Sequence, residues 1–250
     1  MSSISGVNGV NYGAFASGIK LQSASDGAAE MAITEKEDSQ IKGYEAGANN
    51  IGSAKDAINI SDAALGSITD YLQRIRELAL SSMNATVSDS DKKSIQSEID
   101  QMKSGIADVA SQTQYNTKNL LDGSNNSFQI ATDPNGGSST VSTVNATLES
   151  LGIADFDVTG DFDLDKIDEA ISKVSEGRST MGAQSNGLEY LERLNSAASY
   201  NHTASKSKLE DLDYPQAVEE KKKQEVLNQY AIMMQKKKQE EERQKLNLFQ

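Results

Sequence analysis

The sequence of 250 residues contains no cysteine, no tryptophan, one histidine and two prolines, and aromatic residues make up only 5% of it. The lack of cysteine excludes a disulfide scaffold, a thiolate zinc site and a cysteine nucleophile, and one histidine leaves no second imidazole for a paired-histidine metal site. The scarcity of aromatic side chains argues against a thick globular core, because aromatics supply much of the area that such a core buries. The composition instead favours long helices that each bury a narrow apolar stripe.

The sequence also disfavours a membrane span, a cleaved signal peptide and nucleic-acid binding. No apolar run approaches the roughly 20 residues that a membrane-spanning helix needs, so we expect no membrane as a partner. Residues 1–18 have neither a basic region nor an apolar region, which makes a cleaved secretory signal peptide an unfavourable interpretation. The chain has 37 acidic and 24 basic residues, a net charge of -13. Because binding to phosphates needs clustered lysine and arginine, we expect no nucleic acid as a partner.

Two long helices are predicted in the first half of the chain. From about residue 27 to 83, apolar and small residues alternate spacings of three and four, which is typical of a coiled-coil seam. Ser88 is a favourable N-cap, so a second helix should begin there and fold back against the first. The predicted seam of the first helix comprises Ile51, Ala54, Ile58, Ser61, Leu65, Ile68, Leu72, Ile75, Ala79 and Ser82.

The second half begins with the one stretch where strands are plausible. Two short alternating runs, SFQIAT and STVSTV, flank the turn cluster DPNGG, which predicts a β-hairpin. Helix should resume near Asp163 and end at Pro215, since proline cannot donate a hydrogen bond within a helix. The stripe predicted for this last rod helix comprises Ile167, Ile171, Val174, Arg178, Met181, Ser185 and Leu188.

The predicted fold is mainly α: an elongated antiparallel helical bundle or coiled-coil rod with a small β-hairpin insert. We expect a disordered segment at 1–18, a discontinuous helical rod domain at 19–126 and 163–214, a β/loop insert at 127–162, and a charged amphipathic C-terminal helix at 215–250. The residues predicted for the core seam are Ile58, Leu65, Leu72, Ile75, Ile99, Ile106, Ile171, Val174 and Leu188.

Candidates for chemistry are few. His202 lies in a polar helical stretch, where a lone histidine is more often a solvated side chain than a general base. Residues 155–166 resemble a calcium loop, but Lys166 stands where an EF-hand has its bidentate glutamate, so an acidic turn that caps the next helix is favoured. The lysine runs of the C-terminal helix alternate with glutamates, which is typical of a solvated face. We therefore predict no catalytic residue, metal ligand or cofactor, and no enzymatic activity.

One helical surface, at residues 72–80, is a candidate for interaction. If Leu72, Ile75 and Ala79 form the seam, the polar side chains between them face solvent and Leu78 lies half-exposed at the flank. Such a surface is either an ordinary charged helix face or part of an interface with a receptor or another subunit. The residues predicted for this surface are Gln73, Arg74, Arg76, Glu77 and Leu78, with Glu98 of the second helix.

Several stretches resemble the bacterial flagellin family in their order and spacing. SGIKLQSASDGAAEMAITEKEDSQIKG at 17–43 is similar to the first conserved segment of flagellins. LQRIRELA, SDSDKKSIQSEIDQMK and TQYNTKNLLDG, within 72–123, are similar to the flagellin rod. FQIATD at 128–133 is similar to the strand that follows, and residues 171–214 resemble the closing rod helix. The hook-filament junction protein shares this architecture but is a weaker match.

The resemblance implies a self-assembling subunit of the flagellar filament that serves motility, located outside the cell on the bacterial flagellum. It implies that the protein is exported by the flagellar secretion apparatus, with its chaperones, through an uncleaved N-terminal signal. It also implies that the insert at 127–162 is the outward part of the subunit, and that the rod is recognised by the animal Toll-like receptor five in innate immunity. The receptor residues of the family correspond to Arg74, Leu78 and Glu98.

Two departures from the family pattern keep alternatives open. Flagellins normally begin with a long amphipathic helix, and here a glycine- and serine-rich segment stands in its place. Triple lysine and triple glutamate runs in the C-terminal helix are unusual for the wall of a buried tube, since burying charges without partners is costly. The alternatives are therefore a secreted flagellin-like binding module that does not polymerise, or the hook-filament junction protein.

Overall fold

The computed structural model of the chain describes the backbone of residues 12–248 and the surroundings of side chains within 14–244. It divides into two compact units, one formed by residues 1–39 with 201–250 and the other by residues 40–200. The helices are α1 (Tyr12–Ser17), α2 (Ala28–Ser82), α3 (Asp89–Gln112), α4 (Leu148–Leu151), α5 (Asp165–Glu210) and α6 (Tyr214–Leu248). The strands are β1 (Gln114–Tyr115), β2 (Lys118–Asn119), β3 (Ser127–Ala131) and β4 (Ser138–Ser142).

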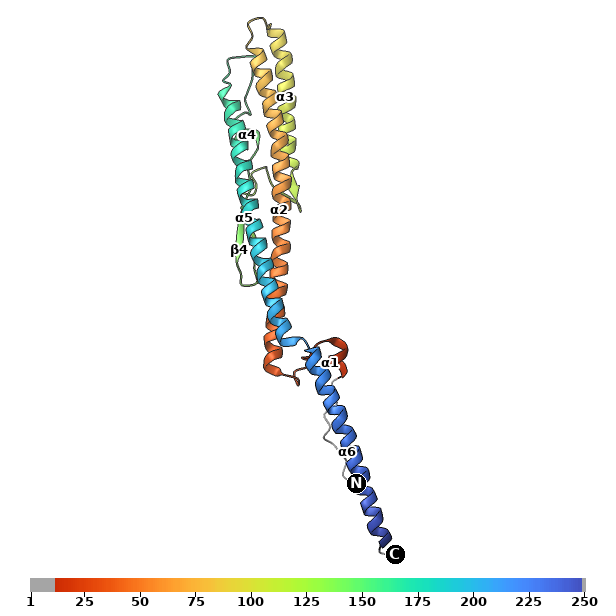
Figure 1. The fold of residues 1–250 in the computed structure, drawn as a ribbon. Coiled ribbons are helices and arrows are strands. Elements are labelled where there is room, and N and C mark those ends of the chain that lie inside the picture. The colour runs from red at the N-terminus through yellow and green to blue at the C-terminus, as the bar shows by residue number, and fades with distance from the viewer. Residues whose placement is uncertain (1–11, 249–250) are drawn as a thin grey trace. The chain divides into compact units, whose positions relative to one another are not determined.

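Within residues 40–200, α2, α3 and α5 run side by side, and α3 folds back against α2 (Figure 1). The return begins at a capping box: Ser88 Oγ accepts a hydrogen bond from the Asp91 amide, and the Asp91 carboxylate accepts one from the Ser88 amide at 3.1 Å. This cap satisfies amides that would otherwise lack partners at the start of α3. The mainly α fold with its small hairpin insert is thus confirmed.

The core of this unit follows the stripes of the three helices. All ten residues of the stripe predicted on the first helix are buried in α2. Eight of the nine residues predicted for the core seam are buried as well, and the ninth, Ile171, is partly exposed and packs at the edge of the core.

The predicted stripe of α5 is wrong at three positions, because Ile171, Arg178 and Ser185 are not buried. In place of Ile171 and Arg178, the helix buries Ala170 and Gly177, one residue earlier in each case. A Cβ added at Gly177 would lie 2.9 Å from Val144 Cγ1, so the segment after β4 packs directly on the glycine backbone. Arg178 points elsewhere and pairs with Asp62 of α2, with 2.8 Å between Nε and Oδ1.

The predicted hairpin is confirmed as the antiparallel pair β3 and β4, in which Phe128 lies opposite Val141. A second, smaller hairpin of β1 and β2 was not predicted, because the stretch 113–126 reads only as a break in the helical pattern. Its turn places Asn116 and Thr117 at φ values of 47° and 64°. A β-branched residue rarely adopts this left-handed conformation, which explains why the sequence did not signal the turn.

The turn between β3 and β4 is fixed against both long helices. Asn195 of α5 is buried, and its side-chain amide donates to the carbonyl oxygen of Thr132 at 2.5 Å. A Cβ added at Gly47 of α2 would lie 2.1 Å from that same oxygen. Only glycine permits this approach, so α2 and α5 together determine where the hairpin lies.

The unit formed by residues 1–39 and 201–250 corrects the prediction of a disordered segment at 1–18. Residues 12–17 form helix α1, while residues 1–11 lie outside the described part of the chain. The Tyr214 hydroxyl donates to the Phe15 carbonyl at 2.6 Å, and the two rings meet edge to face with centroids 5.9 Å apart. This contact gives the six-residue helix α1 apolar packing outside its own short sequence.

Helix α6 differs from the other long helices in burying nothing among residues 214–244. Pro215 lies in its first turn, where no amide is needed, and α5 has already ended at Glu210. The proline therefore begins α6 and does not end the preceding helix, contrary to our prediction. Among the described helices, none combines the length and apolar character that a membrane span requires.

Candidate interaction surface on helices α2 and α3

The predicted interaction surface lies on α2 within residues 40–200. Leu72, Ile75 and Ala79 are fully buried, and their spacing turns Gln73 and Glu77 to solvent. This is the geometry of a helix whose apolar stripe faces its neighbours and whose polar side chains face water.

Arg74 joins this surface to α3. Its Nη2 and Nε atoms donate to the same oxygen of Glu98, at 2.7 and 3.1 Å, and its Nη1 atom lies 3.2 Å from Glu77 Oε2. The hydrogen bonds to Glu98 and then to Glu77 raise the pKa of the guanidinium above its usual value. The side chains of Arg74, Glu77 and Glu98 are 48%, 69% and 41% exposed, so the cluster remains accessible while its arginine is held in one orientation.

Arg76 does not belong to the same cluster, because it pairs with α5. Its Nε atom donates to Asp168 Oδ1 at 2.6 Å, and its Nη2 atom lies 3.4 Å from Oδ2. The hydrogen bond from Arg76 lowers the pKa of Asp168, which also lies in the first turn of α5. The six predicted residues therefore do not form one patch: the structure brings together Arg74, Glu77 and Glu98, with Gln73 exposed on the same helix.

Leu78 is buried, with 7% of its surface exposed, and the prediction of a half-exposed flank residue is wrong. A two-helix seam would leave this position at the edge. Here α2 packs against both α3 and α5, so its buried face is wider than a simple heptad seam and includes Leu78 and Ala57. Leu78 can support the surface from beneath but offers little area to a partner.

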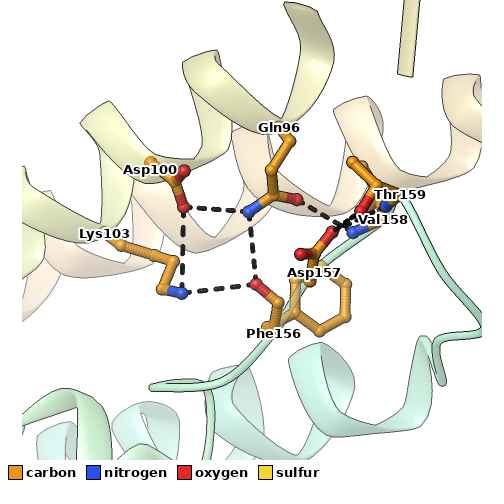
Figure 2. Close-up of polar contacts among 7 residues, drawn as sticks. All are labelled: Gln96, Asp100, Lys103, Phe156, Asp157, Val158 and Thr159. Atoms are coloured by element: carbon orange, nitrogen blue, oxygen red, sulfur yellow. Dashed lines mark hydrogen bonds and ion pairs between the residues drawn. The ribbon is translucent and has the colours of Figure 1, made fainter. Parts of the chain in front are cut away.

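A polar contact that was not predicted joins the loop before α5 to α3 (Figure 2). The side chain of Gln96 accepts from the Val158 amide at 2.8 Å and donates to Asp100 at 2.8 Å. Lys103, whose side chain is only 14% exposed, donates to the Phe156 carbonyl at 3.3 Å. The spacing of Gln96, Asp100 and Lys103 on one helical face was the available signal, but nothing in the sequence indicated which loop they would meet.

The other candidate groups take structural roles. His202 is not a solvated side chain, contrary to our interpretation, because its Nδ1 atom lies 2.5 Å from Glu37 Oε2 of α2. In the acidic loop, Asp163 Oδ1 accepts from the Asp165 amide at 2.9 Å, as expected for a turn that caps α5. Hydrogen bonds from Thr159 lower the pKa of Asp157 in the same loop. Among the residues that the structure describes, no three histidine or carboxylate side chains are placed to hold a metal ion.

Comparison with known families gives two matches that cover most of the chain. Residues 14–126 match the family described as the bacterial flagellin N-terminal helical region, and residues 164–249 match the bacterial flagellin C-terminal helical region. The segment between them contains the β3 and β4 hairpin.

Similar proteins extend these matches over whole chains. A flagellin from Halalkalibacterium halodurans is 32% identical over 82% of this chain and 78% of its own length, and one from Bacillus subtilis is 30% identical over 88% and 85%. Among solved structures, Bacillus cereus flagellin gives a TM-score of 0.52 at 28% identity, covering 58% of this chain and 88% of that one. A hook-associated protein from Vibrio parahaemolyticus, described as putative, gives 0.60 at 16% identity, covering 74% and 100%, which shows a shared fold alone. With both helical regions present in order and relatives matched over most of their length, the chain belongs to the bacterial flagellin family.

Proposed function

We propose that this chain is a structural subunit of the bacterial flagellar filament, located outside the cell, without enzymatic activity. One observation carries the proposal: the two helical regions of the flagellin family, contributed here by α2 with α3 and by α5, share a single buried core within residues 40–200. A rod of long helices with one continuous core is suited to repeated packing between subunits, because each helix has a polar face left over for neighbours.

Electron microscopy of the purified chain under salting-out conditions tests the proposal. We expect filaments of regular diameter, because excluded salts favour the burial of surface between subunits. Persistent monomers of folded protein would instead favour a flagellin-like binding module that does not polymerise. Folding of the sample is checked beforehand by circular dichroism, so that failure to assemble is not confused with failure to fold.

Export through the flagellar secretion apparatus, with its chaperones, is part of the same proposal. We further propose that residues 127–162 form the outward part of each subunit. The support for this placement is that the hairpin lies between the two family regions and packs on Gly47 and Gly177 without interrupting the core. Substitution of the exposed tip residue Asn135 by cysteine, followed by labelling of intact filaments with a maleimide dye, should give surface label. Unlabelled filaments that become reactive only after dissociation would contradict the placement.

The exposed cluster of Arg74, Glu77 and Glu98 supports a second partner, the ectodomain of Toll-like receptor five. A guanidinium held by two carboxylates is pre-organised, so binding costs little side-chain entropy. We expect Arg74→Ala to weaken binding about tenfold or more, the effect of an arginine at a binding hot spot.

Titration of the ectodomain with wild type and Arg74→Ala measures this effect. Arg178→Ala is the matched control, because Arg178 makes a comparable ion pair with Asp62 elsewhere on the same unit and is similarly exposed. Equal affinities for wild type and Arg74→Ala would refute the assignment of this cluster to the receptor.

A further inference from the structure

A pocket of about 450 Å³ lies within residues 40–200, at the place where both hairpins meet α2. Its volume falls in the range of small-molecule pockets, about 300–1,000 Å³. One wall is α2, a second is the β1 and β2 hairpin, and a third is β3, all five residues of which line the pocket. None of the six residues of the predicted interaction surface lines it, and its α2 wall includes Ala54 and Ala57 of the buried core. The side chains that characterise it are Asn50, Asn116, Asn119, Asn125, Tyr115 and Phe128.

Three of these asparagines already use their NH₂ groups. Asn50 Nδ2 donates to the Ala131 carbonyl at 3.0 Å, Asn119 Nδ2 donates to Asp122 at 2.6 Å, and Asn125 Nδ2 donates to the Asn119 carbonyl at 3.4 Å. Within the described part of the chain, no donor is recorded for the side-chain carbonyl oxygens of these three residues. Each amide is thus fixed at its nitrogen end and keeps an acceptor available. A ligand that matches the pocket must bring several hydroxyl or amide donors.

The edge of β3 adds backbone groups of both kinds. Thr132 donates its amide to Gly137 and Thr143 donates its amide to Asn126, which identifies the hydrogen-bonded pairs of the hairpin. Because such pairs alternate along an antiparallel ladder, the amide and carbonyl of Gln129 face away from β4, on the side of α2 where Asn50 meets Ala131. Gln129 therefore offers one donor and one acceptor beside the fixed amides.

Among the described residues that line the pocket, Lys118 is the one charged side chain and no carboxylate is present. Tyr115 and Phe128 are partly buried and supply ring surface, while Ala54 and Ala57 of α2 form a small apolar floor. The pocket thus combines fixed carbonyl acceptors, backbone donors and aromatic surface, and it contains no carboxylate among the described lining residues. This combination suits a ligand with many hydroxyl groups and apolar C–H faces. We propose that this pocket binds a neutral saccharide of the size of a disaccharide.

The test is a titration of the folded, monomeric full chain with maltose, cellobiose and N,N′-diacetylchitobiose, followed by NMR of the aromatic resonances. At least one disaccharide should bind saturably with a Kd of about 1 mM or lower and shift the ring signals of Tyr115 and Phe128. Ser53→Trp places a large side chain on the α2 wall at an exposed lining position and should weaken binding about tenfold or more. Ser67→Trp is the matched control, an exposed serine on the same helix outside the pocket, and should bind as wild type does.

The outcomes separate the proposal from its alternatives and from the proposed filament function. No saturable binding of any of the three disaccharides by folded wild type would overturn it. Equal weakening by Ser53→Trp and Ser67→Trp would place the binding elsewhere and overturn it too. If an extended polyserine-alanine peptide shifts the Gln129 amide while the disaccharides do not, the pocket accepts a β-strand and the saccharide assignment is wrong. None of these results depends on whether the chain forms filaments.

Discussion

Helices α3 and α6 are both regular and both rich in charge, yet they differ in what holds them. Helix α3 buries Ile99, Ile106 and Ala110 against its neighbours and begins at a capping box. Helix α6 has no buried residue among 214–244, and Val226 and Met233 are 64% and 66% exposed. Since helices gain most of their stability from packing an apolar face, α3 belongs to the cooperative core, whereas residues 214–244 of α6 contribute no buried side chain to one.

The largest effect that tests this contrast is expected from Ile106→Asp. Ile106 is fully buried, so the substitution places an unpaired carboxylate in the core and removes apolar packing. We expect a loss of about 4 kcal/mol or more, enough to unfold the unit formed by residues 40–200. Thermal melting followed by circular dichroism measures it, and an unchanged melting curve would refute the assignment of Ile106 to the core.

Met233→Asp is the matched substitution in α6. The same change from an apolar side chain to a carboxylate occurs there at an exposed position, so the main melting transition should remain that of wild type. If Met233→Asp lowered the transition as Ile106→Asp does, α6 would belong to the same cooperative core and the contrast would fail.

The second-largest effect is expected in amide hydrogen exchange of the monomeric chain, which should be much slower in α2 than in α6. Amides of α2 around Leu65, which is fully buried, should exchange only through global unfolding. Amides of α6 should exchange by local opening, with a free energy lower by about 3 kcal/mol or more. Mass spectrometry of peptic fragments provides the measurement. Equal protection in both helices would show that α6 is stabilised within the monomer.

A smaller effect is expected where the hairpin meets α2. At Gly47 an added Cβ would lie 2.1 Å from the Thr132 carbonyl oxygen, a backbone atom that cannot move without displacing the hairpin. We expect Gly47→Ala to destabilise the unit by about 2 kcal/mol in chemical denaturation. Gly52→Ala is the control on the same helix, because no atom of another described segment lies within 4 Å of its added Cβ, and it should stabilise by about 0.5–1 kcal/mol. A gain in stability from Gly47→Ala would show that the close approach is absent in solution.

The features that the sequence predicted correctly are those determined locally. Ser88 signals the start of α3 as an N-cap residue, and the DPNGG cluster signals the turn of the β3 and β4 hairpin. The apolar period of α2 likewise identified ten of its buried residues. These elements needed no knowledge of which segment would pack against them.

The features that the sequence missed depend on a partner far away in the chain. Gly177 is buried because Val144 packs on it, and Leu78 is buried in a core to which all three long helices contribute. His202 pairs with Glu37, 165 positions earlier. For the candidate surface, the sequence predicted that Arg74, Glu77 and Glu98 belong to it. It did not predict that Arg76 pairs with α5 instead.

The smallest effect concerns the ion pair of Arg76 and Asp168. The hydrogen bond from Arg76 lowers the pKa of Asp168 in the folded state, so the pair contributes stability above the unfolded pKa, about 3.9. This contribution is lost as the pH falls through the lower, folded pKa. Asp168→Asn should therefore be slightly less stable than wild type at pH 7, and the difference should vanish in acid. Chemical denaturation of both proteins at pH 7 and in acid measures this difference in stability. Glu241→Gln in α6 is the control and should unfold residues 40–200 in the same transition as wild type. A difference between Asp168→Asn and wild type that grows in acid would contradict this sign, because exposed pairs of this kind contribute only while both groups are charged.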